Sequence, residues 1–298
     1  MGGRAMRQAF ASTANDLFVH DPNVAIVLAE ISGHMFRGAR RHDPLRVVDV
    51  GIAEQTMVGV AAGFAMEGFH PIAHSLSPFM AERPFEQLKL DFGYQGLGGT
   101  FVGAGGSYDY ASEGGTHQAG GDAAAMLAIP RMQVLVPGHG DEVAALLRAS
   151  YANGEPTYVR TSLATNDRAH EVAPGRIEVV RRGMEATVLA FGPMLSRTLA
   201  ATEGFDVTVV YATSLEPFDE HGLAAIAGDE PHVIAVEPWY EAASAPALIR
   251  SLGERPSRYA TIGVPKRFVH DYGSWAEIDA GLGLDERGIR GRLEALIG

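Results

Sequence analysis

The sequence predicts an α/β protein built from two parallel or mostly parallel sheets wound with helices. Three observations lead to this prediction. Short apolar runs rich in β-branched residues, which suit buried parallel strands, recur along the chain. They alternate with longer segments that suit helices, a pattern typical of parallel sheets covered by helices. The alternation is interrupted by a polar stretch near the middle of the chain and then restarts, which indicates two such layers.

In the first half of the chain, apolar runs and helical periodicity place the elements in order. Strands are expected over 24–29, 46–50, 72–75, 100–103, 132–136 and 157–160. Helices are expected over 6–20, 53–67, 78–91, 123–128 and 141–152. In the helix over 53–67, the apolar residues recur at i, i+3, i+4 and i+7, so one face of this helix should be buried.

Residues 103–121 interrupt the pattern, because they hold seven glycines and two aromatic residues without hydrophobic periodicity. A loop of this length inside a compact domain is commonly functional or disordered. We therefore treat it as a candidate for part of a site.

A polar stretch that contains Pro174-Gly175 separates the two halves. We place a first domain at 1–165, a linker at 166–177 and a second domain at 178–298. In the second domain, strands are expected over 186–191, 206–211, 232–236 and 258–262, with helices centred on Leu199, Leu223 and Leu248 between them.

Composition excludes several classes of function. The formal net charge of -12 argues against a nucleic-acid-binding or anionic-membrane surface. The chain has no cysteine, which excludes disulfides, zinc–thiolate sites and cysteine nucleophiles. No apolar stretch approaches the roughly 20 residues of a membrane span, and no signal peptide is evident. We expect a soluble, cytoplasmic protein that acts on a small molecule.

Glu54 lies where the strand over 46–50 ends and the next helix begins. A carboxylate in this position is stabilised by the helix dipole and by free N–H groups. The simplest interpretation is a first-turn acid on a soluble helix; the alternative is a functional acid, because ligands of open parallel sheets bind at the carboxyl ends of the strands.

Other candidates also follow strand ends. His117 lies between glycines and is either merely exposed or a proton donor and acceptor near a ligand. Phe79 is either a core residue or a stacking platform for a flat ring. Arg160 either pairs with an acidic side chain or binds a phosphate group through two N–H groups of its guanidinium, as a phosphate fork. Ser32 and Arg7 indicate nothing by themselves.

Several common motifs are absent from the sequence. There is no Walker A motif, no GxGxxG with dinucleotide spacing and no HExxH pair. Gly120-Gly121-Asp122 starts like a metal–diphosphate motif, but no Asn follows at a useful distance. We therefore expect no metal site in this chain.

Taken together, these stretches resemble the thiamine-diphosphate enzymes of the transketolase and deoxyxylulose-phosphate synthase group. The ordered set of motifs covers nearly the whole chain: Asp49-Val50-Gly51-Ile52-Ala53-Glu54-Gln55, Phe79, Arg83 with Glu86-Gln87, Gly115-Thr116-His117-Gln118, Ile129-Pro130, Tyr158-Val159-Arg160 and Val236-Glu237. Enzymes of this group have a diphosphate-binding, a pyrimidine-binding and a C-terminal domain, and this chain resembles only the last two.

The resemblance therefore implies the second subunit of a split enzyme. Its cofactor is thiamine diphosphate, and Mg²⁺ or Ca²⁺ is held by the partner. The partner is a diphosphate-binding transketolase subunit in an α2β2 assembly, in which this chain also self-associates through its pyrimidine-binding and C-terminal domains.

The resemblance also implies roles for single residues. Glu54 donates a proton to the pyrimidine ring, which activates the cofactor, and His117 contacts substrate oxygens. The other expected contacts fall into two sets. For the cofactor they are Phe79, Leu76, Ile52 and Arg83; for the substrate they are Glu113, Arg160, Ser32, Arg7 and His74.

Three residues depart from the family pattern. Leu76 stands in place of a stacking phenylalanine, Glu113 in place of an aspartate that reads a substrate hydroxyl, and His74 in place of a small hydroxyl residue. These changes indicate an altered acceptor, a hypothesis that efficient turnover of xylulose 5-phosphate with ribose 5-phosphate would contradict.

The main expectation is transfer of a two-carbon ketol unit from a ketose-type donor to an aldehyde-type acceptor. One alternative is decarboxylation of a 2-oxo acid such as pyruvate followed by carbon–carbon bond formation. Another is a noncatalytic partner subunit.

Overall fold

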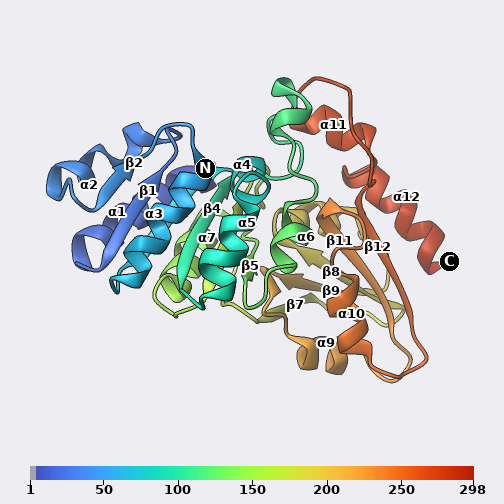
Figure 1. Cartoon of the computed structure of the whole chain (residues 1–298). Coiled ribbons are helices and arrows are strands. Elements are labelled where there is room, and N and C mark those ends of the chain that lie inside the picture. The colour runs from blue at the N-terminus through green and yellow to red at the C-terminus, as the bar shows by residue number, and fades with distance from the viewer. Residues whose placement is uncertain (1–4) are drawn as a thin grey trace.

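The computed structural model describes residues 5–298 and confirms an α/β fold with two mostly parallel sheets. Figure 1 shows the two sheets side by side, the first formed mainly by the blue-to-green part of the chain and the second by the yellow-to-red part. Within the described residues, no helix has both the length and the apolar character to cross a membrane.

The first sheet has seven strands in the order β10-β5-β6-β4-β3-β1-β2. All its neighbouring pairs are parallel except β10 with β5. Its strands are β1 (Val24–Leu28), β2 (Val47–Asp49), β3 (His70–Leu76), β4 (Gly99–Ala104), β5 (Gln133–Leu135), β6 (Pro156–Thr161) and β10 (Ser214–Glu216). The helical segments of this half are α1 (Met6–His20), η1 (Gly33–Phe36), α2 (Arg37–His42), α3 (Glu54–Met66), α4 (Ser77–Ala81), α5 (Phe85–Gln87), η2 (Leu88–Tyr94), η3 (Ala111–Glu113), η4 (Gly115–His117), α6 (Asp122–Leu127) and α7 (Gly140–Ser150).

The second sheet has five strands in the order β12-β11-β8-β9-β7, parallel except for the edge strand β7. Its strands are β7 (Ile177–Arg181), β8 (Ala186–Phe191), β9 (Val207–Ala212), β11 (His232–Tyr240) and β12 (Arg258–Val264). The helical segments are η5 (Gly192–Met194), α8 (Leu195–Ala201), α9 (Glu220–Ala227), α10 (Ala245–Leu252), α11 (Trp275–Gly281) and α12 (Glu286–Ile297).

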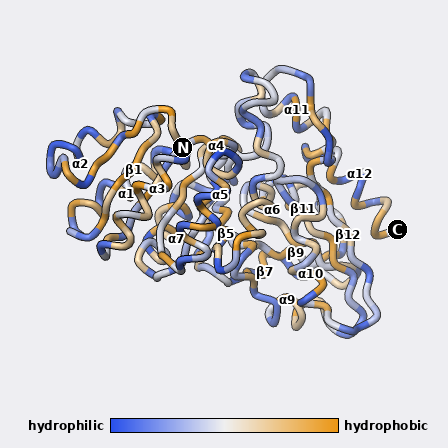
Figure 2. The backbone as a smooth tube through the Cα atoms, in the orientation of Figure 1, coloured by the Kyte–Doolittle hydropathy of each residue, from blue (hydrophilic) through white to orange (hydrophobic). Residues whose placement is uncertain are grey.

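Successive residues of a strand face opposite sides of the sheet, so each strand contributes to two cores. In β1, Ile26 packs with α1 and α7 on one face, whereas Val27 packs with α3 on the other. The core on the α3 side, which contains Val27, also contains Phe191 and Trp239 from the second sheet. One apolar layer is therefore shared by both halves of the chain. Figure 2 shows hydrophobic residues along the strands and hydrophilic residues on outer helices and connecting turns.

The two halves are also joined through backbone hydrogen bonding. The strand β10 belongs to the second half of the chain, yet it pairs with β5 at the edge of the first sheet, with Ser214 opposite Leu135. Neither β10 nor β7 was expected from the sequence. β10 has three residues and β7 carries charged residues, and both strands form by pairing with segments elsewhere in the chain.

One expected helix is broken. The segment expected as a single helix over 78–91 consists of α4, α5 and the wide π-helical turn η2. Pro84 causes the break, because proline has no N–H to donate and restricts the residue before it. As a result, Arg83 lies just beyond the end of α4 rather than within a helix.

Candidate active site

Glu54 is placed by a tight turn at the carboxyl edge of the first sheet. Gly51 adopts a positive φ of 74°, which favours glycine, and Asp49 accepts hydrogen bonds from the backbone N–H groups of Gly51 and Glu30. The chain then enters α3 with Glu54 as its first residue. The side chain of Glu54 is nearly buried, with 3% of its surface exposed.

Two neighbouring elements donate hydrogen bonds to the Glu54 carboxylate. The Nη1 atom of Arg83 lies 3.2 Å from Oε1 and 3.1 Å from Oε2, and Ser75 Oγ at the end of β3 lies 3.3 Å from Oε1. The side chain of Arg83 is 41% exposed, so this ion pair forms at the surface end of an otherwise buried carboxylate.

Phe79 and His117 extend this group of side chains. The Arg83 guanidinium carbon lies 3.6 Å from the centroid of the Phe79 ring, which is a cation–π contact. The imidazole of His117 meets the same ring edge-to-face with centroids 5.0 Å apart. The structure therefore brings Glu54, Arg83, Phe79 and His117 into one continuous cluster from three segments: the start of α3, α4 with the turn after it, and η4.

Leu76 and Ile52 flank the cluster differently. Leu76, the last residue of β3, is 7% exposed, so it lies in the wall beneath the cluster. Ile52, on the turn before Glu54, is 72% exposed. This apolar side chain, two residues before Glu54, is therefore largely exposed to solvent.

His74, Ser32 and Arg7 form a hydrogen-bonded chain below the surface. Arg7 Nε donates to Ser32 Oγ at 2.9 Å, Ser32 Oγ lies 2.9 Å from His74 Nε2, and His74 Nδ1 lies 2.9 Å from the carbonyl oxygen of Val102. A carbonyl only accepts, so Nδ1 carries the proton and Nε2 accepts from Ser32. Burial lowers the pKa of His74 to about 4, so its imidazole is neutral at pH 7.

This arrangement corrects the expectation that His74 and Ser32 bind substrate. His74 has no exposed surface and Ser32 is 4% exposed, and their polar atoms already have partners within the chain. Arg7 is half-buried and remains the member of this chain nearest to solvent. The sequence could not reveal the burial of His74, because polar residues at strand ends are equally compatible with a site and with an internal hydrogen bond.

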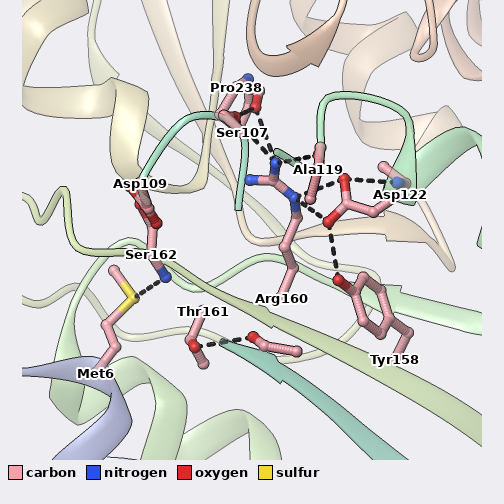
Figure 3. A network of polar contacts seen from close by, with 12 residues as sticks. Met6, Ser107, Asp109, Ala119, Asp122, Tyr158, Arg160, Thr161, Ser162 and Pro238 are labelled. Carbon is pink, nitrogen blue, oxygen red and sulfur yellow. Dashed lines mark hydrogen bonds and ion pairs between the residues drawn. The ribbon is translucent and has the colours of Figure 1, made fainter. Parts of the chain in front are cut away.

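Arg160 also differs from its expected role. Its side chain is 1% exposed, and its Nε atom lies 3.1 and 2.8 Å from the two carboxylate oxygens of the buried Asp122 (Figure 3). The Nη2 atom donates to Ser107 Oγ and to the carbonyl oxygens of Ala119 and Pro238. The Nε and Nη2 groups of this enclosed guanidinium thus have partners within the chain, which supports the interpretation of Arg160 as a partner for an acid over that of a phosphate fork.

The same network explains Asp122, which resembles the start of a metal–diphosphate motif. Asp122 has no exposed surface and accepts a hydrogen bond from Tyr158 in addition to those from Arg160 (Figure 3). Within residues 5–298, no group of three or more acidic or histidine side chains is arranged to hold a metal ion. Asp122 therefore connects the glycine-rich segment to Tyr158 and Arg160 of β6.

Glu113 and His117 lie on the glycine-rich segment, which contacts the second half of the chain. The side chain of Gln118 donates to the carbonyl oxygen of Val269, and a Cβ at Gly114 would meet the Tyr272 hydroxyl at 2.8 Å. Figure 1 shows this green segment beside α11. Sequence reasoning missed residues 267–272, because this stretch has no periodicity and the C-terminal domain was expected to be remote.

The cluster around Glu54 can hold a flat heteroaromatic ring. It combines a nearly buried carboxylate with the aromatic ring of Phe79 and the apolar wall of Leu76. A carboxyl group can hydrogen-bond a ring nitrogen, and an aromatic side chain can stack on the ring face.

Models of two domains match the chain. "Transketolase, pyrimidine binding domain" matches residues 3–165, and "Transketolase, C-terminal domain" matches residues 175–289.

Known proteins are similar over the same length. A protein of Rhodococcoides fascians described as an uncharacterized 33.6 kDa protein in the fasciation locus is 38% identical over 98% of this chain and 95% of its own length. The 1-deoxy-D-xylulose-5-phosphate synthase of Azoarcus sp. is 30% identical over 97% of this chain, which spans 48% of that enzyme. This chain therefore covers about half the length of the synthase relatives.

One solved structure, described as a split gene transketolase, inactive beta4 tetramer, matches over 99% of both chains. Its TM-score is 0.84 and its sequence identity is 27%. A transketolase from Campylobacter jejuni shares the fold with a TM-score of 0.82 at 17% identity, and this chain covers 47% of it.

Proposed function

This chain belongs to the transketolase family, and we propose that it is the pyrimidine-binding subunit of a split thiamine-diphosphate enzyme that transfers a two-carbon ketol unit. The donor is of the ketose type and the acceptor of the aldehyde type. The observation that carries this proposal is the cluster of Glu54, Phe79 and His117 at the carboxyl edge of the first sheet.

The residues fit the proposed cofactor at its pyrimidine end. Glu54 would hold a proton at the ring nitrogen N1′, Phe79 would stack on the ring, and Leu76 and Ile52 would cover it. Bound thiamine diphosphate supplies the electron sink for making and breaking the carbon–carbon bond. We place the diphosphate and its Mg²⁺ or Ca²⁺ on a second subunit.

His117 is the proposed contact to substrate oxygens. It is half-buried, and its Nδ1 atom lies 2.9 Å from Thr116 Oγ1, so its Nε2 atom is the ring nitrogen left to meet a substrate. Glu113 is exposed on the turn that precedes His117, and Arg7 lies at the end of the buried chain through Ser32. We propose Glu113 and Arg7 as acceptor-binding residues, whereas the burial of His74 and Arg160 assigns those two a supporting role.

A test of the catalytic proposal is the Glu54→Ala variant, assayed in a complex with a diphosphate-binding transketolase subunit. Loss of a positioned acid should lower kcat by about 10²- to 10⁴-fold. The matched control is Glu67→Gln, an exposed glutamate at the other end of the same helix, which should keep full activity. A fully active Glu54→Ala complex would contradict the proposal and support a noncatalytic role for this chain.

A second reaction deserves a direct test, because the synthase relatives are 30 to 33% identical to this chain. It is decarboxylation of pyruvate followed by carbon–carbon bond formation. Incubation of the complex with pyruvate and an aldehyde acceptor, compared with a ketose donor and the same acceptor, separates the two reactions. Release of CO₂ from pyruvate would favour decarboxylation, whereas product from the ketose without CO₂ would favour ketol transfer.

The split assembly is testable by mass. We propose an α2β2 complex in which copies of this chain also contact one another through both of their domains. Sedimentation of this chain with its partner should give a species of two copies of each. A mixture that sediments only as separate subunits would contradict the assembly.

A further inference from the structure

Arg83 makes, from within the chain, the two contacts that a pyrimidine ring would make. Its guanidinium is flat and carries N–H donors, one of which lies 3.1 Å from Glu54 Oε2. The same group lies over the Phe79 ring at 3.6 Å. The guanidinium therefore occupies both side chains, Glu54 and Phe79, that the proposed function assigns to the aminopyrimidine ring.

The other neighbours of Phe79 and Glu54 leave little room for both groups at once. His117 already meets the Phe79 ring edge-to-face, so two of the ring's approaches are occupied. The Glu54 side chain is 3% exposed, and both of its oxygens accept from Arg83. A ligand ring that hydrogen-bonds this carboxylate and stacks on Phe79 therefore meets the Arg83 guanidinium first.

The Arg83 side chain can also move away from Glu54 and Phe79. Its side chain is 41% exposed, it follows the end of α4, and Pro84 interrupts the helix directly after it. Rotation of the side chain toward solvent requires no change in the sheet or in α3.

We propose that Arg83 is a self-blocking residue: it competes with the cofactor's aminopyrimidine ring for Glu54 and Phe79 and swings aside when the ring binds. This inference rests on the proposed function. It gives the isolated subunit a closed pyrimidine site in which the buried Glu54 carboxylate has a partner, and it makes opening of that site part of cofactor binding.

The size of the effect follows from the contacts that must break. An ion pair whose arginine is 41% exposed and a cation–π contact of the same group are each weak, and a site that is open only part of the time lowers the apparent affinity by that fraction. We expect removal of the Arg83 guanidinium to tighten ring binding about tenfold, equivalent to about 1.4 kcal/mol.

The experiment measures the binding of thiamine diphosphate, and of 4-amino-5-hydroxymethyl-2-methylpyrimidine as the ring alone, to the full chain by NMR titration. The variants are Arg83→Met, which keeps the length of the side chain without charge or N–H donors, and Arg83→Lys, which keeps the charge without the flat group. The control is Arg148→Met, which removes a similarly exposed ion pair between Arg148 on α7 and Asp16 on α1. Circular dichroism of each variant checks that it is folded.

The expected result is tighter binding by Arg83→Met, an intermediate gain for Arg83→Lys, and no change for Arg148→Met. If Arg83→Met binds the ring equally or more weakly while Glu54→Ala loses it, Arg83 supports the cofactor and the self-blocking role is overturned. If neither Glu54→Ala nor Phe79→Ala changes ring binding in any background, the pyrimidine pocket itself is misassigned and the proposed function fails.

Discussion

Two arginine–carboxylate pairs lie at the carboxyl edge of the first sheet, and they differ mainly in their exposure to water. In the pair of Arg160 with Asp122, the side chains are 1% and 0% exposed. In the pair of Arg83 with Glu54, they are 41% and 3% exposed. The two pairs use the same chemical groups at similar distances, 2.8 and 3.1 Å.

The partners around each pair explain the difference in role. Tyr158, Ser107 and two backbone carbonyls complete the hydrogen bonds of the buried pair, and one of these carbonyls, that of Pro238, belongs to the second half of the chain. Around the open pair, Ser75 donates a further hydrogen bond to Glu54 and the Phe79 ring lies against Arg83. A fully partnered buried pair holds two segments together, whereas an open pair can exchange one member for a ligand.

The largest expected effect is that of Arg160→Met on stability. It leaves the buried Asp122 carboxylate without its cationic partner and removes one donor from the carbonyl oxygens of Ala119 and Pro238, so the free energy of unfolding should fall by about 3–5 kcal/mol. Urea denaturation measures the change. The double variant Arg160→Met with Asp122→Leu should recover much of the loss, since it removes both charges. A loss below about 1 kcal/mol in the single variant would show that the buried pair is no stronger than the open one.

An effect of intermediate size is expected from His74, which is buried like Arg160 but neutral: it should make the free energy of unfolding depend on pH. Its pKa in the folded chain is about 4, below the ordinary 6.5, because burial disfavours the imidazolium. As the pH falls from 6.5 to 4, the unfolded chain takes up this proton first, so the contribution of His74 to stability is present above pH 6.5 and is lost toward pH 4. A difference of about 2.5 in pKa corresponds to a loss of about 3 kcal/mol.

Urea denaturation of the wild type and of His74→Gln across this range isolates the effect. The variant should be less stable at pH 7. Its free energy of unfolding should also fall less between pH 6.5 and pH 4 than that of the wild type. Parallel curves for the two proteins would assign the slope to other groups and would contradict the neutral, buried histidine.

The smallest expected effect on stability is that of Arg83→Met. An ion pair with a partly exposed arginine contributes about 0–1 kcal/mol, and Glu54 keeps its hydrogen bond from Ser75 and its place at the N-terminus of α3. Thermal unfolding should therefore show a change close to that of Arg148→Met. A loss as large as that of Arg160→Met would make Arg83 a structural residue and would remove the distinction between the two pairs.

Much of the fold could be predicted from local pattern. The helix over 6–20 and the strand over 186–191 coincide with α1 and β8, because periodicity and continuous apolar runs are properties of the segment itself. The strands β7 and β10 could not be predicted, since their hydrogen bonds are made with segments distant in sequence. The break in the helix expected after β3 has a local cause in the sequence, Pro84.

The amino-acid sequence by itself determined which residue types stand at the strand ends and in what order: Glu54 after the second strand, Phe79 after the third, and His117 in the glycine-rich segment. Tertiary structure alone decided which of these side chains remain accessible. Arg160 and Arg83 are the same residue at the same edge of one sheet, yet one is enclosed by Asp122 and the second half of the chain, and the other lies at the surface over Phe79. Burial depends on segments brought together only by folding, and burial determines whether a charged side chain holds the structure or is available to a ligand.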